Sequence, residues 1–281
     1  MIDKVWFISG CSTGFGRALA IHVLKTGYKA ILSARKLEDV QDLVSEYPET
    51  AKSVQLDLEH QASIQNCIEQ APKFFGRIDV LVNNAGIGYF SSAEEAEMKI
   101  ARKMFEVNFF GLTELTAGLL PIMRQQKSGH VFNVSSIGGL VGFPGVSFYN
   151  ATKFAVNGYS EALAKEVAHL NIHVTVICPS GFRTDWAGRS AFETPVELED
   201  YKETAAANMA AIRSRSGNQP GDPNKAAEAI VAAYESAEPP LYLLLGMGAY
   251  NGANQKLIDL KKDFDAWADI SKGADVPLAS A

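Results

Sequence analysis

Several features that mark particular classes of protein are scarce or absent in this sequence. Its 281 residues include three cysteines, Cys11, Cys67 and Cys178, and their spacing matches no metal-binding motif. No apolar run reaches the roughly 18 residues of a membrane helix. The N-terminus lacks the charged region, apolar stretch and cleavage site of a signal peptide. Together with the odd number of cysteines, these absences predict a cytoplasmic protein with free thiols.

An excess of basic charge is also missing. The 26 Lys and Arg residues are outnumbered by 32 Asp and Glu residues, and the net charge is −6. Such a balance argues against nucleic acid or an anionic membrane as a partner. The five histidines form no ligand pattern, so no metal is expected (His22, His60, His130, His169 and His173). With no internal repeat or low-complexity linker, residues 1–281 are predicted to form one domain.

Short apolar segments alternate with helical patterns along the chain. The predicted strands cover residues 5–9, 29–35, 53–58, 78–82, 130–136, 172–178 and 241–245. The predicted helices cover residues 17–25, 37–47, 62–75, an interrupted stretch at 98–126, then 149–169 and 222–235. Nearly continuous apolar strands are typical of a parallel sheet that is buried on both faces by right-handed crossovers. The pattern predicts an α/β, doubly wound, seven-stranded parallel sheet with helices on both faces.

Two segments depart from this alternation. Residues 186–220 contain Trp186, Phe192 and an acidic run, and an excursion of this size after a strand suits a substrate-covering lid. Further on, residues 255–270 are amphipathic, with apolar side chains on one face (Leu257, Leu260, Phe264 and Trp267). We expect a C-terminal helical extension at about 250–272 that packs on the body or on a partner subunit.

A glycine-rich turn follows the first predicted strand and precedes the first helix. Gly10, Gly14 and Gly16 would let a phosphate approach the backbone, where helix N–H groups face the anion. The spacing is GxxxGxG rather than GxGxxG, so the turn by itself could be purely structural. Ligands of parallel sheets bind at the carboxyl ends of the strands. Five residues of interest fall at those ends: Gly10, Arg35, Asp57, Asn83 and Ser136.

A tyrosine and a lysine lie four residues apart at the start of a predicted helix. Tyr149 and Lys153 therefore share one face of that helix. A free phenol has a pKa near ~10, and an ammonium one turn away would lower it. Ser136, at the end of the fifth strand, offers a hydroxyl that can hold a substrate oxygen. This trio suits hydride transfer at a carbonyl, although a core tyrosine beside a surface lysine gives the same pattern.

Taken in order, the motifs of residues 4–185 resemble the classical short-chain dehydrogenase/reductase family. They are Gly10-x-x-x-Gly14-x-Gly16, Asp57, Asn83-Asn84-Ala85-Gly86, Asn108, Ser136, Tyr149-x-x-x-Lys153 and Pro179-Ser180-Gly181. They are most similar to the 17β-hydroxysteroid dehydrogenase-like subgroup and its bacterial relatives. The thirteen-residue spacing from Ser136 to Tyr149 is usual in that family and selects Ser136 over Ser135. Two departures are Ser9 in place of the usual threonine and Ser180 between the usual proline and glycine.

The resemblance implies a Rossmann-type fold and a catalytic tetrad. In that tetrad Tyr149 exchanges a proton with the substrate, Lys153 holds the nicotinamide ribose, and Ser136 orients the carbonyl. Asn108, which its helical context alone favours as a satisfied core amide, would anchor a water that links Lys153 to solvent. The resemblance places Asn83 and Gly86 beneath the adenosine ribose. The implied cofactor-binding residues are Gly10, Ser12, Thr13, Gly14, Phe15, Gly16, Arg35, Asp57, Leu58, Asn84, Ala85, Gly86, Tyr149, Lys153, Pro179, Gly181, Phe182 and Thr184.

The end of the second strand bears on the choice of cofactor. Enzymes that prefer NAD(H) commonly place a carboxylate there, which bonds the ribose 2′-hydroxyl. This chain has Arg35 instead, whose guanidinium can pair with a 2′-phosphate. We therefore expect NADP(H) to be preferred, with NAD(H) possible. The alternative is that Arg35 merely solvates the strand end.

These observations predict an oxidoreductase that transfers a hydride between NADP(H) and a small-molecule carbonyl or alcohol substrate. Five aromatic residues predict a pocket for a hydrophobic ketone or secondary alcohol (Phe90, Phe143, Phe148, Trp186 and Phe192). The alternatives are a non-catalytic, nucleotide-sensing member of the same fold and, less strongly, a sugar epimerase. By resemblance, a homodimer or homotetramer is expected, formed through the helices near Gly111 and Tyr149.

Overall fold

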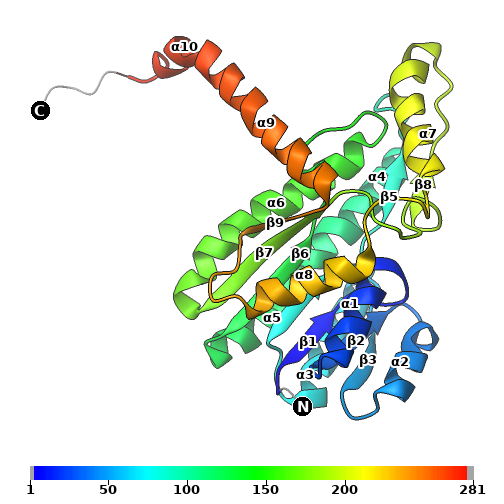
Figure 1. Ribbon diagram of the computed structural model, residues 1–281, viewed down its shortest axis with the longest axis vertical. Helices are drawn as coiled ribbons and strands as arrows, with labels where there is room; N and C mark the ends of the chain where they lie inside the picture. The colour runs from blue at the N-terminus through cyan, green and yellow to red at the C-terminus, as the bar shows by residue number, and fades with distance from the viewer. Residues whose placement is uncertain (1–2, 277–281) are drawn as a thin grey trace, which may run out of the picture.

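Seven parallel strands form the central sheet of the protein. The computed structural model describes residues 3–276, and its sheet has the order β3-β2-β1-β4-β6-β7-β9 (Figure 1). The strands are β1 (Val5–Ile8), β2 (Lys29–Ala34), β3 (Ala51–Gln55), β4 (Val80–Asn83), β6 (Gly129–Val134), β7 (Ile172–Pro179) and β9 (Tyr242–Leu245). From β1 the chain winds outward in both directions, as in a Rossmann-type doubly wound fold. The predicted fold class is confirmed.

Helices cover both faces of this sheet. On one face α1 (Gly14–Lys25) packs against α8 (Pro223–Glu235), and on the other α3 (Gln61–Phe75) packs against α5 (Gly111–Gln126), with α6 (Ser147–Val167) beyond. The side chains of β1 alternate between the two layers: Trp6 and Ile8 face the first, whereas Val5 and Phe7 face the second. Since all four are fully buried, an unbroken apolar strand is what this position in the sheet requires.

Several predicted boundaries differ from the observed ones, and three of the differences matter most. The third strand occupies Ala51–Gln55 rather than residues 53–58, because the Asp57 N–H bonds the Ser63 hydroxyl and turns the chain toward α3. The helix predicted at 37–47 consists of a 3₁₀ turn (Leu37–Val40) followed by α2 (Gln41–Glu46). The interrupted stretch at 98–126 is α4 (Met98–Phe105), a π-helical turn (Glu106–Phe110) and α5, joined without a break.

The segment predicted as a lid forms a small lobe beside the carboxyl end of the sheet (Figure 1). In this lobe β5 (Gly88–Phe90) pairs in parallel with β8 (Ala191–Glu193). A 3₁₀ turn (Glu199–Tyr201), a π-helical turn (Lys202–Ala206) and α7 (Ala207–Ser214) follow. Met209 of α7 packs with Phe90 and Val146, so the lobe has its own apolar cluster.

The C-terminal helices leave the body of the molecule. α9 (Met247–Ala266) and α10 (Ala268–Lys272) extend away from the sheet as an arm (Figure 1). The extension expected at 250–272 is helical, but beyond Ala253 it does not pack on the body. Leu257 is 66% exposed and Phe264 is 65% exposed. Between residues 3 and 276, no helix has both the length and the apolar character that are needed to cross a membrane.

Candidate active site

The glycine turn after β1 is shaped for close approach. Gly10 and Gly14 have positive φ angles of 74° and 59°, which glycine adopts without strain. A Cβ on Gly16 would lie 2.4 Å from the Gly10 carbonyl oxygen, so only glycine fits there. The first turn of α1 carries no acidic residue, and the Thr13 side chain does not cap it. Its N–H groups are therefore available to an anion.

The loop after β4 holds this turn in place. The Asn84 amide donates hydrogen bonds to the carbonyl oxygens of Ser9 (2.9 Å) and Gly10 (3.1 Å). In return the Ser9 hydroxyl accepts from the backbone N–H groups of Asn84 (2.9 Å) and Ala85 (3.0 Å). Ser9 thus supplies the hydroxyl at the position where the family usually has threonine. Asn84 and Ala85 shape the turn by these bonds.

Asn83 contributes to the scaffold. It is 3% exposed, and its amide donates to the Thr116 hydroxyl (2.9 Å) and to Asn133 Oδ1 (2.8 Å). Asn133 in turn donates to the Ser160 hydroxyl at 2.8 Å, so β4, β6, α5 and α6 are tied together. This network turns the Asn83 side chain into the interior, and the place of the residue beneath a nucleotide ribose stays a prediction. Gly86 does lie at the site: a Cβ there would be 3.8 Å from Lys153 Nζ.

The tyrosine and lysine lie together on α6, as their spacing predicts. Lys153 Nζ is 5.8 Å from the centre of the Tyr149 ring, and it donates to the Val134 carbonyl oxygen at 2.8 Å. Lys153 is only 5% exposed. Ser136 begins the 3₁₀ turn Ile137–Gly139 after β6, where its hydroxyl accepts from the Gly138 N–H at 3.0 Å. The end of β6 and the start of α6 therefore bring three of the four tetrad residues together.

Asn108, the fourth, lies in the π-helical turn between α4 and α5. Its Oδ1 accepts from the Ile87 N–H (2.8 Å), and its Nδ2 donates to the Ile87 carbonyl oxygen (2.9 Å) and to Thr152 Oγ1 (3.2 Å). π-helical turns inside helices often occur at functional sites. The satisfied amide expected from local sequence is confirmed. Its role in anchoring a water stays a prediction.

The pKa values of Tyr149 and Lys153 differ from what their spacing predicts. Burial raises the pKa of Tyr149 to about 12, and the Ser136 hydroxyl only partly opposes it. Burial likewise lowers the pKa of Lys153 to about 8. The expected acidification of Tyr149 by Lys153 is therefore wrong for the protein by itself, because burial raises the pKa of the phenol and only the Ser136 hydroxyl lowers it. At neutral pH Tyr149 carries its proton, which is the form that donates to a carbonyl oxygen.

Arg35 stands free at the end of β2. Its side chain is exposed, and within residues 3–276 it forms no ion pair. Nearby, Asp57 Oδ1 accepts from the Glu59 N–H at 3.1 Å, and Leu58 is buried. Since the Arg35 guanidinium is not committed to a protein carboxylate, it can pair with a ligand anion.

The loop after β7 folds over the glycine turn. Pro179 ends β7, and the Phe182 ring packs edge-on against Phe15 with their centres 5.4 Å apart. A Cβ on Gly14 would lie 3.4 Å from Thr184. The implied cofactor residues of the two segments are therefore neighbours in space, although about 165 residues of chain separate them.

One contact in this region could not be seen in the sequence. Arg189, in the predicted lid, donates to the Thr13 hydroxyl at 2.8 Å and so places a cation at the N-terminus of α1. No motif surrounds Arg189, and the two residues are 176 positions apart. Arg189 and Thr13 are neighbours because the lobe folds back over the glycine turn.

The predicted aromatic pocket is partly formed. Phe90 and Trp186 lie in one cluster with Phe143 and Tyr149, and the Trp186 ring centre is 4.8 Å from that of Tyr149. Phe148 packs in a different cluster, with Tyr89 and Met104. Phe192 is 42% exposed and lies beneath the Lys103 ammonium. Phe192 is therefore not part of the wall that adjoins Tyr149, whereas Phe148 shares its cluster with Tyr149.

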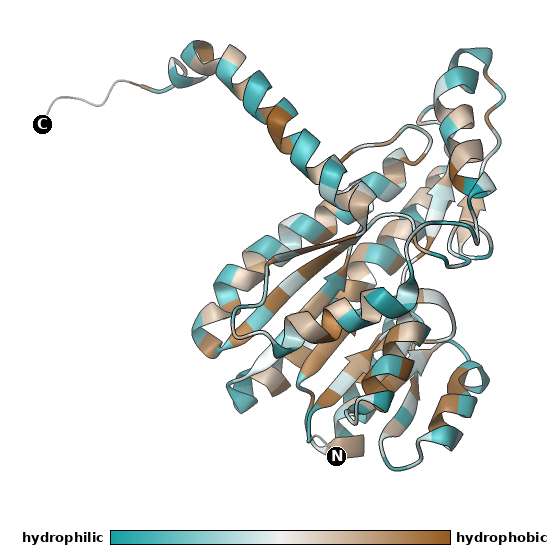
Figure 2. Ribbon diagram, viewed as in Figure 1, coloured by the Kyte–Doolittle hydropathy of each residue, from teal (hydrophilic) through white to brown (hydrophobic). Residues whose placement is uncertain are grey.

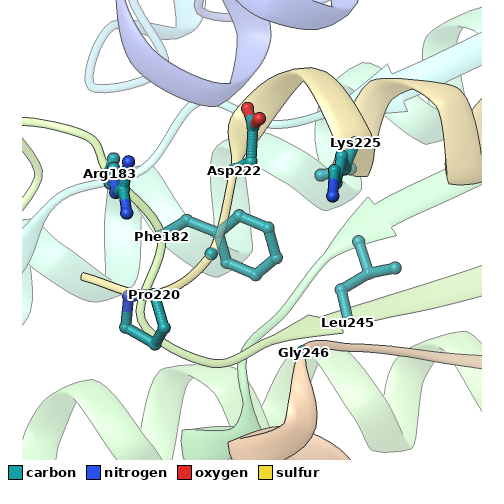
Figure 3. Close-up of a pocket in the computed structure, with 9 residues that line it drawn as sticks. Phe182, Arg183, Pro220, Asp222, Lys225, Leu245 and Gly246 are labelled. Atoms are coloured by element: carbon teal, nitrogen blue, oxygen red, sulfur yellow. The ribbon is translucent and has the colours of Figure 1, made fainter.

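A separate pocket of about 480 Å³ opens where α8 begins and β9 ends (Figure 3). Its lining includes Phe182, Arg183, Lys225 and Leu245 but none of the four tetrad residues. This pocket therefore lies apart from the predicted tetrad. Within residues 3–276, no cluster of three or more His, Cys, Asp or Glu side chains is arranged to hold a metal ion.

A doubly wound sheet with an anion-binding glycine turn at its switch point defines a dinucleotide-binding α/β protein, and Tyr149, Lys153 and Ser136 lie together beyond the end of β6. The chain belongs to the short chain dehydrogenase family, whose family model matches residues 4–193. It is thus a member of an oxidoreductase family.

Similar proteins support this assignment over almost the whole chain. Oxidoreductase BOA17 of Botryotinia fuckeliana is 38% identical over 271 residues, which cover 96% of this chain and 98% of the relative. A 3-ketodihydrosphingosine reductase of Bacteroides thetaiotaomicron is 33% identical over 247 residues, 88% of this chain and 89% of the relative. The crystal structure of a short-chain dehydrogenase from Streptomyces avermitilis has a TM-score of 0.91 at 38% identity, with 97% and 98% coverage.

Proposed function

We propose that this protein transfers a hydride between NADP(H) and a hydrophobic ketone or secondary alcohol, with Tyr149 as the acid and base. The observation that best supports the proposal is the environment of the Tyr149 hydroxyl group. Lys153 lies one turn away, Ser136 adjoins it, and Trp186 covers its ring. A protonated phenol in an apolar setting can donate its proton to the oxygen of a carbonyl as that carbonyl is reduced.

The chain fits a dinucleotide at the glycine turn. When bound, the nicotinamide would supply or accept the hydride. Gly10 and Gly14, with their positive φ angles, shape the turn, and the free N–H groups of α1 would hold the diphosphate. Lys153 would hold the ribose, and Ser136 would orient the substrate oxygen.

The preference for NADP(H) rests on Arg35. A charge-assisted hydrogen bond contributes ~1.5–3 kcal/mol, which corresponds to a preference in kcat/KM of roughly tenfold to a hundredfold. Arg35→Ala should remove most of this preference and spare activity with NADH. Lys165→Ala, which deletes an exposed charge on α6, is the control and should leave the ratio unchanged. Equal or better turnover of the wild type with NADH would contradict the proposal.

The substrate class rests on the apolar wall of Phe90, Phe143 and Trp186. A relative named for the reduction of a keto compound agrees with this choice. Oxidation of NADPH, followed by absorbance over a panel of apolar and polar ketones, tests it. Tyr149→Phe should lower kcat by ~10²–10⁴-fold and leave NADPH binding nearly intact. Binding of NADPH without turnover of any ketone would instead favour a nucleotide sensor.

We also propose that residues 186–220 act as a lid. The Arg189 contact with Thr13 joins this lobe to the anion-binding end of α1, which supports the idea. Amide hydrogen exchange in residues 186–213 should slow when cofactor and ketone bind. Equal exchange in the free and ternary states would favour a fixed structural lobe.

Two further proposals concern the cellular compartment and the subunit contacts of the protein. Its three cysteines are buried and free, which agrees with a reducing compartment such as the cytoplasm. Phe110 and Phe154 are 47% and 45% exposed at the start of α5 and on α6, which agrees with subunit contacts through these helices. Titration of the thiols tests whether the cysteines are free. Measurement of the molecular mass in solution tests whether subunits associate.

A further inference from the structure

The arm formed by α9 and α10 has almost no support from the rest of the chain. At its base Gly252 lies against Ile137, and only Ala249 and Ala253 of α9 are buried. Beyond Ala253 the helix projects from the body, with brown apolar positions among teal ones (Figure 2). Helices in water draw most of their stability from packing of an apolar face. The exposed apolar side chains of this arm therefore call for a partner.

Six apolar side chains of the arm follow a seven-residue repeat. They are spaced alternately by three and four positions, and we call them the seam: Tyr250, Ala253, Leu257, Leu260, Phe264 and Trp267. Four of them are 60–66% exposed (Tyr250, Leu257, Phe264 and Trp267). A repeat of this period keeps apolar positions facing a second helix along a coiled coil. The sequence of the arm is therefore suited to pairing with another helix.

The charges beside the seam select the direction of pairing. Lys256 and Asp263 occupy equivalent positions on one flank, and Lys261 lies on the other flank, where it pairs with Asp265 of the same helix. In a parallel pair of arms, Lys256 would face Lys261 of the partner subunit. In an antiparallel pair, Lys256 instead faces Asp263 of the partner subunit, and two-fold symmetry repeats the contact. Only the antiparallel pair brings opposite charges together.

The same antiparallel register matches the sizes of the seam side chains. Leu257 meets Leu260 of the partner subunit, and Tyr250 meets Trp267 of the partner subunit. Each aromatic side chain can bury roughly 150–250 Å². With three aromatic residues on each arm, the contact reaches on the order of 1,000 Å², the size at which specific interfaces begin.

We propose that α9 is a dimerisation arm that pairs, antiparallel and seam to seam, with α9 of a second copy of this chain. The tip of each arm then lies against the base of the other, where Met247 is 74% exposed. This contact is distinct from the α5 and α6 faces considered above and does not depend on the proposed activity.

Two neighbouring substitutions test the seam. Leu257→Lys places a charge in the seam, whereas Ile258→Lys changes a residue of similar exposure (62%) that lies off the seam. Light scattering after size exclusion at micromolar concentration should show that Leu257→Lys halves the mass, from tetramer to dimer or from dimer to monomer. Ile258→Lys should leave the mass unchanged. A monomeric wild type, an unchanged Leu257→Lys mass, or equal effects of both changes would overturn the proposal.

A charge reversal tests whether the two arms pair in the antiparallel direction. Lys256→Asp sets two carboxylates opposite each other in the antiparallel pair and should weaken the dimer roughly tenfold in Kd, since two surface pairs turn from attraction to repulsion. Adding Asp263→Lys should restore wild-type affinity. In a parallel pair Lys256→Asp would instead face Lys261 and tighten the dimer. Tightening, or no rescue by the double variant, would overturn the antiparallel arrangement. Circular dichroism should show unchanged folding, because these side chains contact solvent.

Discussion

A buried histidine should make the stability of this protein sensitive to mild acid. His130 of β6 is 2% exposed, its ring stacks on Phe132 with centres 3.9 Å apart, and its Nε2 lies 2.9 Å from the Thr175 hydroxyl. Burial, with a smaller contribution from His173, lowers the pKa of His130 to about 3. The unfolded chain, in contrast, takes up a proton on this residue near the ordinary histidine pKa of ~6.5.

The direction and the size of this change in stability with pH follow from proton linkage. Because the folded-state pKa is lower than the unfolded one, the unfolded chain binds more protons between about pH 6.5 and pH 3. The free energy of unfolding must therefore fall as the pH drops through that window. At ~1.4 kcal/mol per pH unit, the loss contributed by His130 between pH 7 and pH 5 is about 2 kcal/mol.

Urea unfolding of wild type and His130→Phe at both pH values measures this contribution. Phenylalanine keeps the stacked ring, and the Thr175 hydroxyl still donates to the Pro240 carbonyl oxygen at 2.7 Å. On acidification from pH 7 to pH 5, the free energy of unfolding of His130→Phe should fall by about 2 kcal/mol less than that of wild type. The exposed His169 serves as control, since His169→Gln should behave as wild type does. Equal acid sensitivity of wild type and His130→Phe would refute the reasoning.

Two further predictions concern the site. Since the pKa of Lys153 is about 8, kcat/KM for alcohol oxidation should show a limb in that region that belongs to the coupled Tyr149–Lys153 pair. Lys153→Met should abolish this limb, and a limb that persists near pH 8 in this variant would exclude its assignment to the pair. Gly16→Ala places a Cβ 2.4 Å from the Gly10 carbonyl oxygen. It should reduce stability by about 1–3 kcal/mol and weaken dinucleotide binding, as measured by urea unfolding and calorimetry. Gly158→Ala on α6, where a Cβ meets nothing within 4 Å, should do neither, and equal behaviour of the two variants would contradict the tight fit at Gly16.

Much of the architecture is determined by local sequence. Runs such as residues 5–8 must be strands buried on both faces, because every side chain is apolar and only a central parallel strand buries both sides. Gly10, Gly14 and Gly16 define a close-approach turn, and the spacing of Tyr149 and Lys153 puts both on one helix face. In each case the relevant distance lies within one strand, turn or helix, where the period of the chain sets the geometry.

Tertiary structure decided what depends on distant parts of the chain. It turned Asn83 into the interior toward Thr116 and Asn133, and it brought Arg189 to Thr13. Burial of Tyr149 in the folded protein raised the pKa of its phenol. The amphipathic pattern of residues 255–270 predicted a helix but not its departure from the body. Side-chain direction, loss of water and the choice of packing partner arise from contacts between segments that no local periodicity encodes.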